Sequence, residues 1–216
     1  MGCSNSSKTA SPTKAGGKLI LGYHKGFRGR AGPTRAILAY AKVDWEDCFY
    51  DDKNKWADAK GKLPMAFPNL PYINDGKCQI TESEACVRYA AGKYCPELLG
   101  KTIEEKCKIN IISSKIDDCF DAMFGFASGK EDLAKMPSMI EAHFKPICSH
   151  MGTSKFLAGD KVTYVDFKML DVAGLVNSGT NGQLLKECPA MGPYMERICA
   201  LPNFCDYLKS DRYKAY

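Results

Sequence analysis

A short segment with two prolines is the first place where the residue types suggest binding chemistry. Pro68 and Pro71 bracket Asn69-Leu70, directly before an alternating apolar and polar run. Because proline has no amide hydrogen, a proline in a sheet must lie at an edge, at the start of a strand or in a bulge. We therefore expect the backbone of this segment to pair with something other than a neighbouring strand.

Glu82 and Ser83 stand where the sequence predicts the start of a helix. The unpaired amides and positive dipole end of a helix start, together with the Ser83 hydroxyl, can bind an anionic group, and Glu82 can meet a cation. An N-cap with an acidic first turn is the more common reason for these residue types at such a place. On the residues alone, both interpretations stay open.

The elements around these residues form an α/β half followed by a helical half. Apolar runs predict strands at residues 19–23 and 43–50, with a helix between them that begins near Pro33. The turn signal Asn74-Asp75-Gly76 predicts a hairpin with strands at 71–73 and 78–80. Helical patterns follow at 82–94, 103–126, 133–149, 165–176, 193–200 and 204–210.

The residues from Thr163 to Asp166 form a variant of the capping box. The threonine hydroxyl is expected to accept an unpaired amide of the new helix, and the Asp166 carboxylate to accept the amide of Thr163 in return. We expect this motif to have a structural role.

Composition excludes several classes of function. The chain has 216 residues and a mass of 23.8 kDa, which suits one large domain or two small ones. Its 30 basic and 25 acidic side chains contain no Lys/Arg block with interleaved aromatics, so a nucleic-acid partner is not expected. No apolar run approaches the ~18 residues that a membrane-spanning helix needs.

The cysteines and histidines do not form a metal motif. Eleven cysteines lack any CxxC pair, and the N-terminus lacks the apolar core of a signal peptide. We expect free thiols in a reducing compartment, and hence a cytoplasmic protein. His24, His143 and His150 are too dispersed to predict a metal site with these cysteines.

The N-terminal tail, residues 1–17, has a chemistry of its own. Gly2 and Ser6 fit the pattern for N-myristoylation after removal of Met1, and Cys3 is placed for palmitoylation. Two acyl chains would anchor the protein stably to the cytoplasmic face of a membrane. The tail is also rich in Ser, Gly, Lys and Thr, so the alternative is an unmodified flexible tether.

The order of elements and the motifs resemble the cytosolic glutathione transferases over nearly the whole folded chain. The most similar class is mu, through the segments Trp56-Ala-Asp-Ala-Lys60, Phe67-Pro-Asn-Leu-Pro-Tyr72, Asp75-Gly76, Ile80-Thr-Glu-Ser83 and Lys209-Ser-Asp-Arg212. Arg28-Gly29-Arg30-Ala31 looks instead like the sigma class. The resemblance implies a thioredoxin-like glutathione-binding domain at 18–95, an all-α domain at 102–216, a homodimer, and glutathione as co-substrate without a metal.

The resemblance also assigns roles in binding glutathione. It implies a cis Pro71 that lets the main chain of Leu70, next to Asn69, pair with the cysteinyl backbone of glutathione in place of a strand. Trp56 and Lys60 would hold the glycyl end, Ser83 the γ-glutamyl carboxylate and Glu82 the ammonium group. Asp118, beside Asp117, would reach the ligand of the other subunit, and Phe67 would enter a pocket on that subunit.

Tyr23, at the end of the first predicted strand, is the candidate catalytic residue. A phenol can donate a hydrogen bond to sulfur, which lowers the pKa of the thiol and increases the fraction of nucleophilic thiolate. Arg30 would add positive potential, as the matching sigma arginine does. One residue more than in the family pattern separates Tyr23 from Arg28, and Gly26 is expected to absorb it in a turn.

The function predicted from these residues is conjugation of glutathione to hydrophobic electrophiles, which is a detoxification reaction. The electrophile would lie between the domains, against candidate residues His24, Phe120, Phe124 and Phe126. One alternative is a glutathione-binding or scaffold protein that has lost turnover through the insertion after Tyr23. Another is a glutathione-dependent isomerase or peroxidase, which the sigma-like Arg30 suggests.

Overall fold

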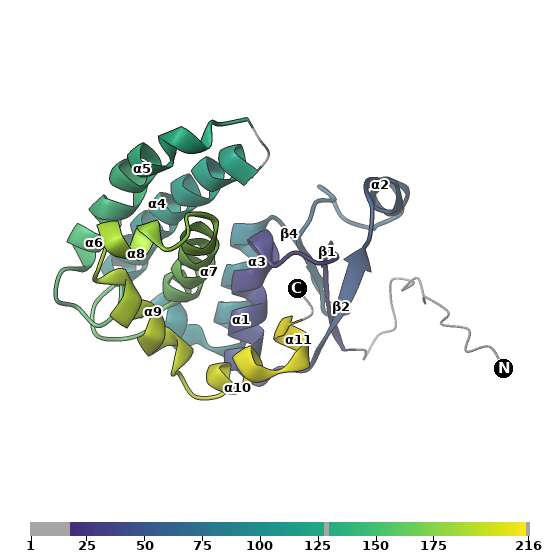
Figure 1. Ribbon diagram of the computed structural model, residues 1–216. Helices are drawn as coiled ribbons and strands as arrows, with labels where there is room; N and C mark the ends of the chain where they lie inside the picture. The colour runs from purple at the N-terminus through teal and green to yellow at the C-terminus, as the bar shows by residue number, and fades with distance from the viewer. Residues whose placement is uncertain (1–17, 128–129, 215–216) are drawn as a thin grey trace.

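A computed structural model describes residues 18–127 and 130–214. The tail with the predicted acylation sites Gly2 and Cys3 lies outside the described residues. Within them the chain folds as predicted, with an N-terminal α/β half and a C-terminal helical half (Figure 1).

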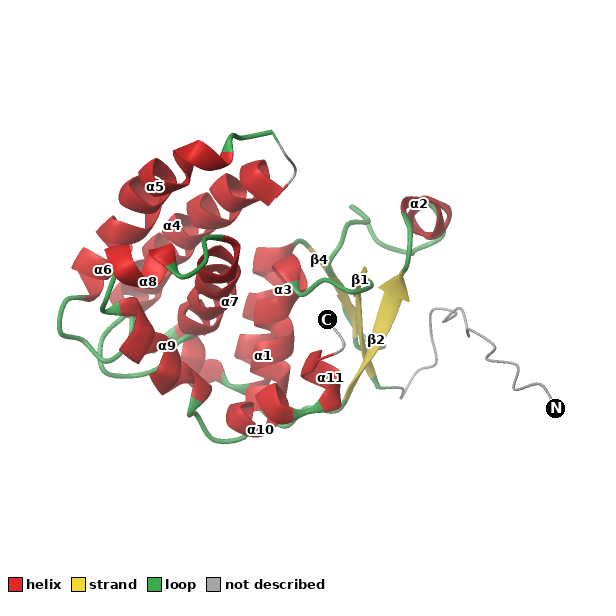
Figure 2. Cartoon of the chain, viewed as in Figure 1, coloured by secondary structure: helices red, strands yellow, loops and turns green. Residues whose placement is uncertain are grey.

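The N-terminal half is built on a mixed sheet in the order β2-β1-β3-β4. Its strands are β1 (Leu19–His24), β2 (Trp45–Tyr50), β3 (Tyr72–Asn74) and β4 (Gln79–Thr81). β1 runs parallel to β2 and antiparallel to β3, and β3 and β4 form the predicted hairpin. Figure 2 shows the sheet beside the block of helices.

Two helices cover one face of the sheet. Helix α1 (Gly32–Tyr40) connects β1 to β2, and α3 (Ser83–Tyr94) follows β4. Successive side chains of a strand point to opposite faces, so Leu21 and Ile73 face these helices and are fully buried. The second strand begins at Trp45, because the amide of Val43 bonds to Leu38 O and still belongs to the end of α1.

One element of this half has no counterpart in the predicted pattern. Helix α2 (Lys53–Lys60) begins after Asp52, whose carboxylate accepts a hydrogen bond from the amide of Lys55 at 2.8 Å. Its residues are mostly exposed and polar, so apolar periodicity cannot reveal it. In Figure 1 it lies at the end of β2, away from α1 and α3.

The C-terminal half consists of helices around a buried centre. The long helix α4 (Ile103–Ala127) and the central helix α7 (Tyr164–Gly179) pack together, and α7 also contacts α1 and α3. Figure 1 shows α7 between α4 and α1. The remaining elements are the 3-10 turns 96–99 and 133–135 and the helices α5 (Met136–Met139), α6 (Lys145–Met151), α8 (Gln183–Glu187), α9 (Met191–Cys199), α10 (Phe204–Lys209) and α11 (Asp211–Lys214).

The single helix predicted over 133–149 is interrupted. A π-helical turn, Ile140–Phe144, separates α5 from α6, and the amide of Lys145 bonds to Ile140 O. Pro146 follows directly and has no amide to continue the ordinary ladder. The prediction of one regular helix here was therefore wrong in detail, although the segment is helical to Met151.

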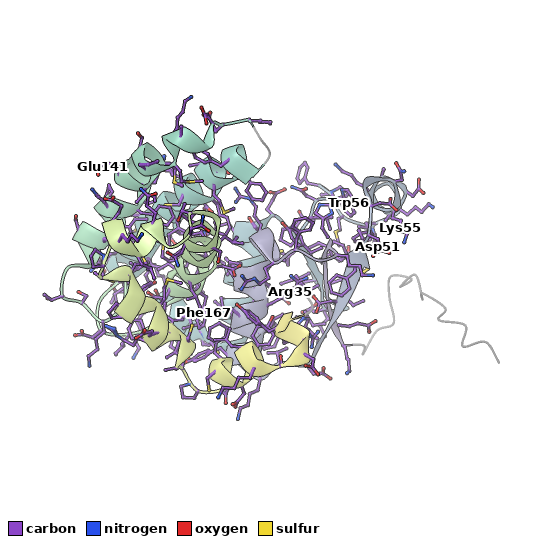
Figure 3. All side chains as sticks on the ribbon, viewed as in Figure 1. Arg35, Asp51, Lys55, Trp56, Glu141 and Phe167 are labelled. Carbon is purple, nitrogen blue, oxygen red and sulfur yellow. The ribbon has the colours of Figure 1, made fainter. Side chains whose placement is uncertain are left out.

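The C-terminal segment returns to the sheet. The Arg212 guanidinium donates to Trp45 O at 2.7 Å and to Asp47 Oδ2 at 2.9 Å. Asp47 also accepts from Arg35 Nε at 2.8 Å, and Figure 3 labels this buried arginine between α1 and the sheet. The segment ending in Arg212 thus ties the helical half to β2.

Candidate functional site

The register of the sheet gathers the predicted site residues at one edge. Gly22 pairs with Tyr72, so the next residue of β1, Tyr23, lies beside Pro71. Tyr72 pairs with Thr81, so Pro71 also neighbours Glu82 across the hairpin. The catalytic candidate, the proline segment and the start of α3 therefore meet at the same edge.

The proline segment has the backbone that the resemblance implies. The Leu70–Pro71 peptide bond is cis. Asn69 ties the segment together, because its Oδ1 accepts the amide of Leu70 at 2.9 Å and its Nδ2 donates to Glu82 Oε1 at 2.9 Å. A ligand that uses the amide of Leu70 must displace or share this bond with Asn69.

Glu82 lies in a strained backbone conformation directly before α3. Its φ angle is +70°, which is rare for a residue other than glycine and costs of order 1 kcal/mol or more. Such conformations are found most often at binding sites, where the surrounding structure holds them. Glu82 is exposed and directly precedes Ser83, the first residue of α3.

Trp56 lies at the far side of the same edge. It belongs to α2 and packs on Tyr50 with ring centroids 5.1 Å apart and planes at 70°. Figure 3 labels it beside α2. Lys60, in the last turn of α2, is exposed. The structure thus brings Trp56 to the edge of the sheet through α2, the helix that the apolar pattern did not predict.

The Tyr23 side chain is only 6% exposed, and its hydroxyl accepts a hydrogen bond from the amide of Arg30 at 3.1 Å. Burial raises the pKa of Tyr23 above its ordinary value of 10.0, although the amide and charge of Arg30 oppose the shift. The phenol is therefore protonated at neutral pH, and it can still donate its own proton. Between Tyr23 and Arg28 the chain makes a turn at Gly26, where φ is +74°.

The Arg30 guanidinium points to helix α4 rather than to the Tyr23 hydroxyl. It pairs with Asp121, lies 3.7 Å from Asp117 Oδ1, and lies over the rings of Phe120 and Phe124 at 5.5 and 5.8 Å from the centroids. These four residues share one face of α4. Phe120 is buried and Phe124 is 41% exposed, so of these two aromatic candidates Phe124 offers surface to an electrophile.

The structure separates the two neighbouring aspartates. Asp117 faces the inside of the chain, where it contacts Arg30 and Lys168. Asp118 is exposed and pairs with Lys115 at 2.5 Å. Phe67, the predicted dimer contact, is 78% exposed, which is unusual for so large an apolar side chain.

A buried cluster of charged side chains next to the site was not predicted from the sequence. Lys168 of α7 contacts Glu84 Oε2 and Ser113 Oγ at 2.6 Å each and Asp117 Oδ1 at 3.0 Å. The only signal for it in the sequence is a lysine inside the apolar run of this helix. A cavity of about 10 Å³, lined by Arg30, Pro33, Ser83, Val87, Asp117, Phe120 and Lys168, joins this cluster to the site.

Glu84 makes this cluster sensitive to acid. Burial acts to raise its pKa, but the charge of Lys168 and hydrogen bonds from Lys168, Tyr164 and Arg88 outweigh burial and lower the pKa from 4.5 to about 2. The folded state therefore holds this carboxylate ionised where the unfolded chain would protonate it. The stabilisation is complete above pH ~4.5 and is lost as the pH falls toward 2.

We expect E84Q to remove this part of the acid sensitivity. Urea unfolding at pH 6 and pH 3.5 should give a smaller loss of unfolding free energy for E84Q than for the wild type. E141Q is the matched control, because Glu141 forms an exposed i,i+4 pair with Lys145. An E84Q protein with the same pH slope as the wild type would contradict the expectation.

A second hollow lies away from these residues. Its volume is about 380 Å³, and its lining comes from the start of α4 and the loop before α7 and includes Lys101, Glu105, Lys108, Ile109 and Lys161. It contains none of the predicted site residues.

Residues 18–127 and 130–214 contain neither a metal site nor a membrane-spanning helix. No group of three or more His, Cys, Asp or Glu side chains in these ranges is placed to hold a metal ion. No helix of the same ranges combines the length and apolar character needed to cross a membrane.

Comparison with known families and proteins agrees with this geometry. Residues 22–92 match the glutathione S-transferase N-terminal domain, and residues 127–211 match the C-terminal domain. Human glutathione S-transferase Mu 3 is 32% identical over 205 residues, covering 90% of this chain and 89% of the relative. The class-mu 26 kDa isozyme of Schistosoma japonicum is 32% identical over 206 residues, covering 91% of each.

Solved structures show the same fold. Rat hPGDS complexed with a quinoline superposes with a TM-score of 0.76 at 24% identity, covering 89% of this chain and 96% of that chain. The glutathione S-transferase from Ascaris lumbricoides gives 0.76 at 23% identity, with 89% and 97% covered. With the family matches and the mu-class relatives, these results show that the chain belongs to the glutathione S-transferase family.

Proposed function

We propose that this protein conjugates glutathione to hydrophobic electrophiles and that Tyr23 stabilises the glutathione thiolate. The observation that carries the proposal is the strand register, which puts Tyr23, at the end of β1, beside cis Pro71. The amide of Arg30 bonds to this hydroxyl. Accepting that bond polarises the phenol and makes it a better donor to sulfur. Membership of the family supports the reaction class.

Glutathione would extend along the edge of the sheet. Its cysteinyl backbone would pair with the main chain at Leu70, with Asn69 releasing the amide. The γ-glutamyl end would lie at Ser83 and Glu82, where helix amides meet a carboxylate and an acid meets the ammonium group. Trp56 and Lys60 would hold the glycyl carboxylate through an indole N–H and a positive charge.

The reaction needs ionised sulfur and a held electrophile. The thiol proton leaves to solvent, the sulfur lone pair forms the new bond to the electrophilic carbon, and the leaving group departs with its electron pair. Tyr23 donates its hydrogen bond to the developing thiolate, and Arg30 adds positive potential. The exposed part of Phe124, with His24 and Phe126, would form the wall for the electrophile.

A homodimer would complete the site. Asp118 lies on the exposed face of α4, from which it would reach glutathione in the partner subunit. The exposed Phe67 would provide an aromatic anchor. Both assignments come from the family resemblance, and the exposure of the two side chains is compatible with them.

The test is conjugation of glutathione to 1-chloro-2,4-dinitrobenzene, followed by absorbance, with glutathione binding measured by calorimetry. Turnover supports the proposal. Binding without turnover on a panel of electrophiles would favour the scaffold alternative. Turnover confined to a hydroperoxide or an isomerisable prostanoid would favour the peroxidase or isomerase, for which the sigma-like segment Arg28–Ala31 is the supporting observation.

We also propose that acylation at Gly2 and Cys3 places the enzyme at a membrane, an inference from the sequence pattern alone. In eukaryotic cells fed an alkyne analogue of myristate, the wild type should be labelled and recovered with membranes. G2A should lose the label and move to the soluble fraction, and C3S should keep the label but bind membranes weakly. An unlabelled wild-type protein would rule out myristoylation.

A further inference from the structure

The Arg30 guanidinium lies near two carboxylates of helix α4, Asp121 and Asp117, at different distances. It pairs directly with Asp121, but its NH1 lies 3.7 Å from Asp117 Oδ1. Asp117 is much closer to another cation, because Lys168 Nζ lies 3.0 Å from the same Oδ1 and donates to Oδ2 at 3.1 Å. The lysine and the arginine therefore share one carboxylate, and the lysine holds the closer position.

The buried Lys168 side chain is held in this position by contacts with residues of two other helices. It is 4% exposed, and besides Asp117 it contacts Glu84 of α3 and Ser113 of α4. A buried ammonium group must be compensated by carboxylates, so it cannot leave the cluster without cost. The Glu84 carboxylate also accepts hydrogen bonds from Arg88 and Tyr164. Within the described residues, the ion pairs of Asp117 are with Lys168 and Arg30.

Removing the lysine charge would therefore act on Arg30. Asp117 is only partly exposed, so without Lys168 it would draw the Arg30 guanidinium from 3.7 Å into a direct ion pair. Such a pair would give the arginine a second direct carboxylate beside Asp121 and pull it along α4. The amide of the same residue bonds to the Tyr23 hydroxyl, so the shift would also reach the catalytic candidate.

We propose that Lys168 is a positioning residue for Arg30: by satisfying Asp117, it leaves the guanidinium with the exposed Asp121 as its direct carboxylate partner, so that its charge can still act on the sulfur of bound glutathione. The proposal rests on the function assigned above to Tyr23 and Arg30. It also links the start of α3 to the catalytic residues, since Glu84, the neighbour of Ser83, is the second carboxylate partner of Lys168.

The test is K168M, with the double variant K168M/D117N and with K135M as the matched control. Lys135 also pairs with a carboxylate, that of Glu131, but both side chains are exposed and neither is assigned to the site. We expect K168M to raise the pKa of the bound glutathione thiol by about 0.5–1 unit and to lower kcat/KM at pH 6.5 by about 3- to 10-fold. K135M should behave as the wild type.

The double variant distinguishes a role of Lys168 in positioning Arg30 from a purely structural role. Since the carboxylate that would capture Arg30 is absent, K168M/D117N should return to within about twofold of the wild type. A double variant as impaired as K168M, or more so, would mean that Lys168 is merely structural and would overturn the proposal. If K168M does not fold, K168R should retain the thiol pKa of the wild type, and D117N alone should not raise it. A raised thiol pKa in either protein contradicts the proposal.

A measurement on the ligand-free protein tests the positioning role of Lys168 separately from the proposed enzymatic function. The Nε–Hε NMR signal of Arg30 in the ligand-free protein, assigned with R30K, should move in K168M, return in K168M/D117N and stay in place in K135M. A signal that K168M leaves in place overturns the positioning role whatever the kinetics show. A wild type that neither binds glutathione nor turns over refutes the proposed function instead, and the Arg30 signal still decides whether Lys168 positions it.

Discussion

Replacing Tyr23 by phenylalanine is expected to lower kcat/KM for glutathione conjugation at pH 6.5 by about 10- to 100-fold. The substitution removes the hydroxyl but keeps the ring, which is buried at the end of β1. Without a donor, the thiol of bound glutathione should return toward its ordinary pKa of about 8.5. The pKa is measured from the thiolate absorbance of the complex against pH.

The activity deficit of Y23F should depend on pH. Burial raises the pKa of Tyr23, so the phenol keeps its proton and acts as a donor through the neutral range. In Y23F the deficit should be largest at low pH and should shrink toward pH 9, where the thiol ionises without help. A deficit that stays constant over this range would mean that Tyr23 positions the ligand rather than stabilising thiolate.

Y89F is the matched control for this experiment. The Tyr89 hydroxyl also makes a hydrogen bond, to Asp75 near the hairpin of the same half, but it lies outside the residues assigned to the site. Y89F should conjugate glutathione at the wild-type rate. Unchanged turnover and thiol pKa in Y23F would exclude Tyr23 as the activating group and would favour the scaffold or other-substrate alternatives.

The sequence was sufficient where residue type alone decides local structure. Apolar runs located β1 and β2, and the turn signal Asn74-Asp75-Gly76 located the hairpin of β3 and β4. The resemblance supplied the cis bond before Pro71, which local physics alone would not favour. Once the register of the strands is known, it explains why Tyr23, Pro71 and Glu82 are neighbours.

The features that the sequence did not predict lack an apolar pattern or depend on contacts between residues distant in sequence. Helix α2 has no apolar face to reveal it, and the π-helical turn depends on how Pro146 meets the preceding ladder. The ion pair of Arg30 with Asp121 of α4 joins residues 91 positions apart in the chain. The contacts of Lys168 with Glu84 of α3 and Asp117 of α4 join helices that are distant in sequence, so no local pattern contains them.

The largest loss of stability is expected from Asp166→Ala. This buried carboxylate completes the predicted capping box and accepts four hydrogen bonds, which come from Thr163 N at 2.7 Å, Thr163 Oγ1 at 3.0 Å, Leu157 N at 3.0 Å and Tyr194 OH at 2.9 Å. Alanine would leave these buried donors without an acceptor. We expect a loss of about 3–5 kcal/mol in unfolding free energy.

The comparison with Thr163→Ala shows how this cost arises. Thr163→Ala removes one capping hydroxyl and should cost roughly 1 kcal/mol, equivalent to about 2–4 °C in Tm for a chain of this size. Asp166→Ala should lower Tm by about 10 °C or more at the same protein concentration. Asp160→Ala, at an exposed position of the preceding loop, should change stability by less than about 0.5 kcal/mol. If Asp166→Ala cost no more than Thr163→Ala, Asp166 would serve only as a helix cap. The larger cost would show instead that one carboxylate joins the start of α7 to the preceding loop and to α9, and so stabilises the helical half against which the glutathione-binding half packs.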